Sequence, residues 1–135
     1  MKLKELMRVL INSEMEDISV FEVEAVAFRS DPRCGAELAA LFLRLAEEKR
    51  ARLKILKHLS KEGTGFRQRK TETARSVEAS FRLHATRAAR SVSLYVDLLK
   101  QLHKPEFKDE VGEMASAERR TLAAIKKLQE KLKQP

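Results

Sequence analysis

The chain has 135 residues, of which 28 are Lys or Arg and 20 are Asp or Glu, so its formal net charge is +8 at pH 7. This length is typical of a single domain. With only four Gly, three Pro and 5% aromatic residues, the chain is too poor in turn formers for an all-β sandwich or barrel. Charged residues interrupt every stretch that could form a membrane span or the apolar segment of a signal peptide, which argues against both.

The charge excess and the single cysteine bear on location and partners. Basic residues occur in every segment and alternate with acidic ones, which favours solvated helix faces over a nucleic-acid interface. Nucleic-acid binding therefore remains only a weaker alternative. Cys34 has no second cysteine with which to form an internal disulfide, so we expect a cytoplasmic protein.

Two helices are predicted in the first half of the chain. Helical periodicity runs over 3–29 and stops before Pro32, because the residue preceding a proline is pushed out of the α region. A second helix is expected over 36–60. It is followed by Gly63 and Gly65, which predict a flexible break.

Two further helices are predicted in the second half. The third spans about 72–103, and Pro105 is well placed to open a fourth helix over 105–133 because proline favours the first helical turn. Only a few residues join the helices within each half, so each half should form an antiparallel hairpin. The sequence thus predicts one all-α four-helix domain made of two hairpins.

The connection between the hairpins decides the topology. A linker over about 61–71, at roughly 3.3 Å per residue, reaches about 40 Å, the length of a helix of about 25 residues. The second hairpin can therefore start at the opposite end of the bundle, which predicts the long crossover of ferritin-like folds. A loose loop between ordinary neighbours is the alternative.

Polar residues interrupt the inward-facing heptad stripe of each helix. A buried charge without a partner costs several kcal/mol, so polar residues that converge on one layer need a shared explanation. The interrupting residues are Glu14 in the first helix, Lys49 and Arg52 in the second, His84 mildly in the third and Glu118 in the fourth. In the first helix either Asp17 or Ile18 takes the next stripe position.

The two halves look alike, and several short motifs are spread over them. They are Glu14 seven residues before Phe21, the Asp31-Pro32 turn, the Leu41-Phe42-x-x-Leu45-Ala46-Glu47-Glu48 stretch, Tyr95, the Pro105 turn and Glu118. In these features, which span nearly the whole chain, the sequence resembles the rubrerythrin-like branch of the ferritin superfamily. The resemblance implies a ferritin-like bundle. In that family the bundle holds two irons with one Glu from each of two helices and a Glu-x-x-His pair from each of the other two.

The metal ligands that the resemblance implies are mostly missing. Glu14 matches the first Glu, and Glu118 matches the Glu of the second Glu-x-x-His. The other four positions are occupied by Lys49, Arg52, Ala88 and Thr121 in place of Glu, His, Glu and His. No Glu-x-x-His occurs anywhere in the chain. We therefore expect neither a bound metal nor another cofactor.

Three interpretations of Glu14 and Glu118 remain open: leftover metal ligands, solvated residues, or ion-pair partners of Lys49 and Arg52. We favour ion pairing, because two carboxylates and two cations balance in charge. Asp17 and His84 are expected in the polar core near this layer. We expect His84 to be a hydrogen-bonded core histidine, since one His without a second gives poor metal coordination.

The sequence favours a non-catalytic function and offers no catalytic residues. It predicts a scaffold or partner-binding bundle, expected to form a homodimer and open to another protein partner but not to a membrane. The alternative is a residual metal-binding oxidoreductase or iron-handling protein that uses Glu14 and Glu118.

Overall fold

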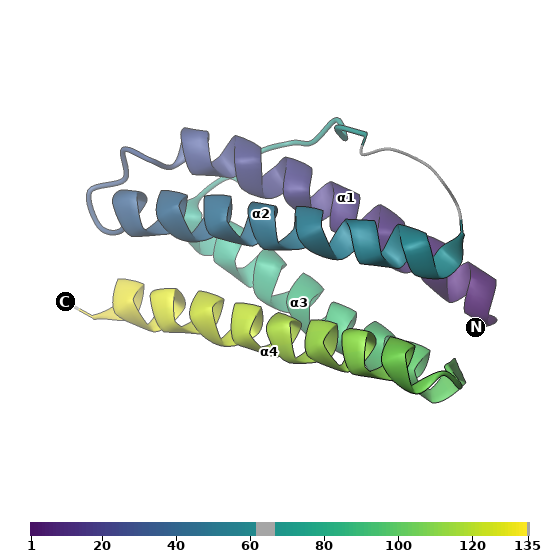
Figure 1. Ribbon diagram of the computed structural model, residues 1–135. Helices are drawn as coiled ribbons and strands as arrows, with labels where there is room; N and C mark the ends of the chain where they lie inside the picture. Colours follow the sequence, from purple (N-terminus) through teal and green to yellow (C-terminus); the bar gives the residue numbers. More distant parts are fainter. Residues whose placement is uncertain (62–66, 135) are drawn as a thin grey trace.

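The computed structural model of the protein describes residues 1–61 and 67–134 and contains four helices (Figure 1). They are α1 (Leu3–Ala27), α2 (Gly35–Ser60), α3 (Val77–Gln101) and α4 (Pro105–Lys133). Within the described ranges no residue lies in a strand, so the predicted all-α four-helix architecture is confirmed. None of these helices is both long and apolar enough to cross a membrane.

The helix ends differ from the predicted ones mainly in α3. This helix begins at residue 77 rather than 72, because the Ser76 hydroxyl accepts a hydrogen bond from the Ala79 backbone N–H at 3.1 Å and caps it. It ends at residue 101 rather than 103. The first helix likewise ends at residue 27 rather than 29. The fourth begins at Pro105 as predicted.

The helices pack as two pairs. α1 packs closely against α2, and α3 against α4, with short turns between the partners, as expected of two hairpins. The pairs meet through α1 against α3 and α2 against α4. The core therefore lies between all four helices, and inward side chains from each helix meet there.

The connection between the pairs follows α1. The Arg69 N–H donates to the Ser19 hydroxyl at 2.9 Å, and the Ala74 N–H donates to a carboxylate oxygen of Glu24 at 3.0 Å. The chain thus returns along α1 toward the end where α1 stops and α2 starts, and α3 begins there (Figure 1). The predicted glycine break at Gly63 and Gly65 lies outside the described residues.

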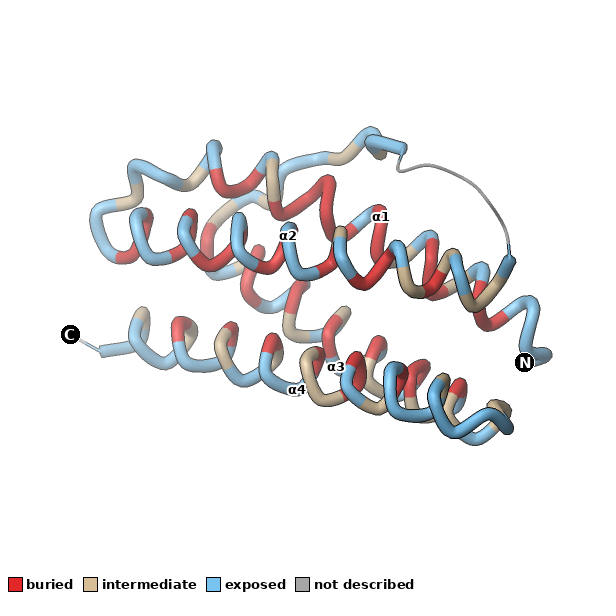
Figure 2. Tube along the Cα trace, viewed as in Figure 1, coloured by how far each residue is buried: buried red, intermediate tan, exposed pale blue. Residues whose placement is uncertain are grey.

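Buried residues form one continuous stripe along the inner face of each helix (Figure 2). Large apolar side chains lie on both sides of the middle of this core. The fully buried side chains Leu10, Phe42, Phe81 and Leu98 are among its largest members. At mid-bundle the stripe contains charged residues instead, and these form the candidate site.

Candidate functional site: a buried ion cluster

The ammonium group of Lys49 lies among three carboxylates. Its Nζ is 3.3 Å from Oε1 of Glu14, 3.1 Å from Oδ2 of Asp17 and 3.1 Å from Oε1 of Glu118. The Lys49 side chain is only 1% exposed, so these contacts are shielded from bulk solvent. α1 provides two of the carboxylates at positions 14 and 17, which share a face because they are three residues apart.

Arg52 supplies a second cation one helical turn further along α2. Its Nη1 lies 2.9 Å from Oε1 of Glu118 and 3.4 Å from Oε1 of Glu14. Glu14 and Glu118 therefore each contact both Lys49 and Arg52. These distances confirm the predicted pairing of the two carboxylates with the two cations.

Two side chains from α3 complete the arrangement. The Tyr95 hydroxyl donates to Oε1 of Glu14 at 2.7 Å, and the Arg87 guanidinium donates to Oδ1 of Asp17 at 2.6 Å. Arg87 also reaches the backbone oxygen of Ser13 at 3.4 Å. Arg87 escaped the sequence analysis because it lies beside the heptad stripe, partly exposed, and reaches inward along its stem.

We call the following seven residues the ion cluster: Glu14, Asp17, Lys49, Arg52, Arg87, Tyr95 and Glu118. Its three carboxylates and three cations balance in charge. Across the part of the chain that the structure describes, no buried side-chain nitrogen or oxygen lacks a hydrogen-bond partner. Such complete pairing is the condition under which buried charges are tolerated, since an unpaired one carries its full desolvation penalty.

The cluster changes the protonation equilibria of its members. Burial alone would lower the pKa of Lys49, but Glu14, Asp17 and Glu118 outweigh burial and raise this pKa above its usual range. Burial likewise disfavours the Arg52 cation, yet Glu14 and the neighbouring groups raise its pKa. Both cations therefore stay charged at any physiological pH.

The pKa values of the two acidic groups on α1 shift in opposite directions. Burial would raise the pKa of Asp17, but Lys49 and Arg87 overcome it and lower this pKa. Burial raises the pKa of Glu14 against the opposing pull of Lys49 and Arg52. Burial, reinforced by Glu14, raises the pKa of Tyr95 well above its usual range, so its hydroxyl remains a donor.

The remaining positions that the resemblance singled out are buried but stand outside the cluster. Ala88 contributes only a methyl group. The Thr121 hydroxyl donates to the Ala117 backbone oxygen of its own helix at 3.2 Å. Of the six ligand positions that the resemblance implies, only those of Glu14 and Glu118 thus hold a carboxylate, and both carboxylates already contact cations.

His84 pairs with a residue that the sequence analysis missed. Its Nε2 lies 2.7 Å from Oε1 of Glu24, which also accepts a hydrogen bond from the Ser80 hydroxyl at 2.9 Å. The imidazole stacks on Phe21, with ring centres 4.3 Å apart. His84 is therefore a hydrogen-bonded core histidine, as predicted, and its partner is Glu24.

Cys34 is buried just before α2 begins. Burial raises the pKa of Cys34, with Asp31 adding to the rise, and the neighbouring Arg33 opposes them only in part. Arg33 is itself occupied by Asp31 and Glu78. The thiol is thus protonated and unreactive at neutral pH.

The lowered pKa of Asp17 predicts a specific pH dependence. Ionised Asp17 stabilises the fold above its ordinary pKa of about 3.9, and this stabilisation is lost as pH falls through the lower folded pKa. Asp17→Asn should therefore unfold more easily than the parent near pH 7, whereas the two should converge once the pH falls below the lowered folded pKa of Asp17. Urea unfolding of both proteins from pH 7 to pH 2 measures this difference. A difference independent of pH would mean that Asp17 is not ionised in the folded protein.

The cluster does not fit a bound metal. Iron in a helical bundle needs several oxygen and nitrogen donors that converge on one point. Here a lysine ammonium lies where the three carboxylates converge, and no group of three or more His, Cys, Asp or Glu side chains in the described ranges is placed to hold a metal ion. The arrangement can cross-link the four helices, but it offers a cation no free donors.

Known proteins supply no match to this chain, since no family model, no curated protein and no solved structure was found to be similar to it.

Proposed function

We propose that this protein is a metal-free, non-catalytic bundle, a degenerate ferritin-like relative of the rubrerythrin-like branch, that acts as a scaffold or partner-binding protein. One observation carries the proposal. The ammonium of Lys49 contacts Glu14, Asp17 and Glu118 at 3.1–3.3 Å in the layer where the family would hold its irons. The ammonium and the Arg52 guanidinium take the structural place of the metal charge.

The charges of the cluster support this proposal. A metal ion would have to displace an ammonium whose pKa is raised by the same carboxylates that the metal needs. Arg52 cannot lose its proton at all and would repel the metal from Glu14 and Glu118. A residual di-iron oxidoreductase is therefore the weaker hypothesis.

A closed core leaves the surface to carry the function. Apart from the partly exposed Arg87, the cluster is buried, and its polar groups are fully paired, so it presents no reactive group to a substrate within the described part of the chain. We infer that another protein, or a second copy of this chain, is recognised by the outer faces of the helices. We propose a homodimer in the cytoplasm as the working state.

Metal content tests the proposal. After expression in iron-supplemented medium, we expect elemental analysis to find far less than one iron, manganese or zinc per purified chain. Light scattering of the same sample should give about twice the 15.5 kDa chain mass if the protein pairs with itself. About two irons per chain, with peroxide-dependent turnover, would contradict the proposal.

A variant that reinstates the missing ligands is the matched comparison. Its four changes are Lys49→Glu, Arg52→His, Ala88→Glu and Thr121→His. With Glu14 and Glu118, the four new side chains give the buried layer six donor residues, and both cations are removed. About two irons per chain are therefore expected, in contrast to the parent. Circular dichroism confirms that the variant is folded before metal is added.

A further inference from the structure

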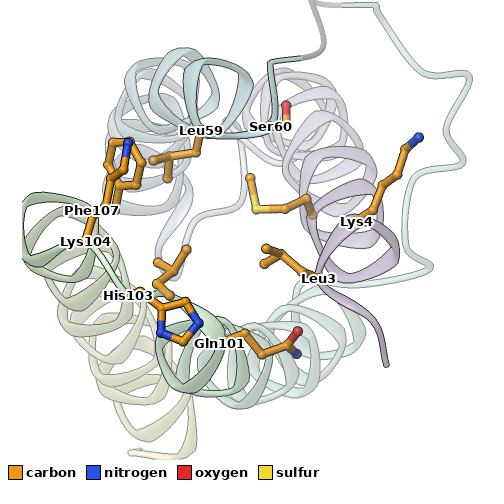
Figure 3. Close-up of a pocket in the computed structure, with 10 residues that line it drawn as sticks. Leu3, Lys4, Leu59, Ser60, Gln101, His103, Lys104 and Phe107 are labelled. Carbon is orange, nitrogen blue, oxygen red and sulfur yellow. The ribbon is translucent and has the colours of Figure 1, made fainter.

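A second feature lies at one end of the bundle, where α1 and α4 begin and α2 and α3 end. A cavity of about 460 Å³ opens there between the four helices (Figure 3). This volume falls within the range of about 300–1,000 Å³ that is typical of small-molecule sites, and bundles often form such sites between their helices. Gln101 borders the cavity and donates from its side-chain amide to the Met1 backbone oxygen at 3.1 Å.

The walls of the cavity are mainly apolar. Leu3 and Met7 of α1, Leu59 of α2, Leu102 and Phe107 line it, and Figure 3 shows Leu3 directed into the opening. The cavity is separate from the ion cluster, because Glu14 follows Met7 by seven residues, a rise of about 10 Å along α1. The site is thus suited to a medium-length alkyl chain, independently of the cluster.

The rim of the cavity is basic. Lys4, His103 and Lys104 belong to its lining, and none of the ten lining residues that the structure describes is acidic. Among the described residues no carboxylate forms an ion pair with Lys4 or Lys104; the Lys104 ammonium instead lies 5.3 Å from the Phe107 ring centre. In Figure 3 the Lys4 side chain points away from the opening, and its flexible stem can turn toward a ligand head group.

The side chains of Lys4 and Lys104 favour a ligand of negative charge. Two helix N-termini and two C-termini meet at this end, so their dipoles largely offset one another. The two lysines then leave a net positive rim. The same charges disfavour a second copy docking by this end, because Lys4 and Lys104 of both copies would be brought together.

We propose that this cavity binds an amphipathic monoanion, a medium-length unbranched alkyl chain that ends in a carboxylate. The alkyl chain would lie against Leu3, Met7 and Leu59, with the carboxylate at the mouth beside Lys4 and Lys104. This inference does not depend on the metal-free state of the core. Either proposal can fail without the other.

Two probes of equal chain length and opposite charge test the proposal. In titration calorimetry at low salt we expect decanoate to bind once per chain, and decyltrimethylammonium to bind at least about tenfold more weakly. Added salt should weaken decanoate binding because the head-group contact is exposed. Equal affinity of the two probes, or no decanoate binding up to millimolar concentration, would overturn the proposal.

Two pairs of variants locate the site. The double substitution Lys4→Glu with Lys104→Glu should weaken decanoate binding about tenfold. Lys126→Glu with Lys127→Glu removes the same charge from exposed positions on α4 and should change the affinity less than about twofold. Similar losses in both double variants would show that net charge, not the rim, attracts the ligand.

Filling the cavity provides the second comparison. Leu59→Trp should abolish decanoate binding, whereas Leu43→Trp, at a partly exposed position of the same helix outside the cavity, should preserve it. Preserved binding in folded Leu59→Trp would overturn the proposal. A change in the molecular mass of the protein caused by Leu59→Trp would also overturn it, because it would identify a second copy of this chain as the occupant of the cavity. If Leu59→Trp does not fold, the rim variants still decide the outcome.

Discussion

Replacement of Lys49 by methionine is expected to lower the free energy of unfolding by about 3–5 kcal/mol. Methionine fills a similar volume but leaves Glu14, Asp17 and Glu118 without the ammonium that contacts all three. Three buried carboxylates then share only Arg52 and Arg87, so one negative charge is uncompensated. Because small domains are stable by only about 5–15 kcal/mol, the loss is a large part of the total.

Urea unfolding at pH 7 measures this loss, with Lys126→Met as the control. Lys126 is exposed on α4, so the control should change the free energy of unfolding by less than about 0.5 kcal/mol. The deficit of Lys49→Met should shrink in acid, because protonation removes the excess negative charge of the cluster. If Lys49→Met unfolds no more easily than the control, the carboxylates do not depend on the ammonium.

Breaker residues and periodicity predicted most of the fold. Pro32 and Pro105 act locally, since proline restricts the residue before it and lacks an N–H, and the helices stop or start close to them. The start of α3 has a weaker signal. Ser76 caps that helix, but serine is too common in sequences to mark a helix start by itself. The predicted start at residue 72 therefore rested on periodicity alone.

The interrupted stripes also predicted the centre of the site. Glu14, Lys49, Arg52 and Glu118 were expected at one layer because each interrupts an otherwise apolar seam. The contact between Lys49 and Glu118 could not be predicted from their spacing in the sequence. Lys49 and Glu118 are 69 residues apart, and their contact depends on how the two hairpins pack.

Glu24 and Arg87 were not predicted from the sequence, for identifiable reasons. Glu24 lies ten residues after Glu14 on the same inward face, which was a usable signal, but its partner His84 is 60 residues away. Arg87 gave no such signal, because its backbone lies beside the stripe and only its long side chain reaches Asp17. The cavity depends on the relative positions of four helix ends and so had no counterpart in the sequence pattern.

A double-mutant cycle on Lys49 and Glu118 should give a large coupling free energy. Glu118→Gln preserves the shape of the side chain but removes its charge, so the cluster gains an uncompensated cation. The pair Lys49→Met with Glu118→Gln restores charge balance. We therefore expect the double variant to be less destabilised than the sum of the single variants by about 1.5–3 kcal/mol.

An ion pair elsewhere in the bundle calibrates this cycle. Glu22 and Arg50 lie 2.8 Å apart with side chains about one third exposed, and solvent weakens such a pair. Glu22→Gln and Arg50→Met should couple by only about 0.2–1 kcal/mol. The comparison separates the effect of burial from that of a simple charge contact.

The coupling free energy of Lys49 with Glu118 tests most directly whether the buried ion pairs hold the core together. It is measured by urea unfolding of the parent, the two single variants and the double variant at pH 7. A value of about 1.5–3 kcal/mol, clearly above that of the Glu22 and Arg50 pair, is predicted. Additive effects within about 0.5 kcal/mol would show that the two residues do not depend on each other, and would contradict the ion cluster as the device that holds the core together.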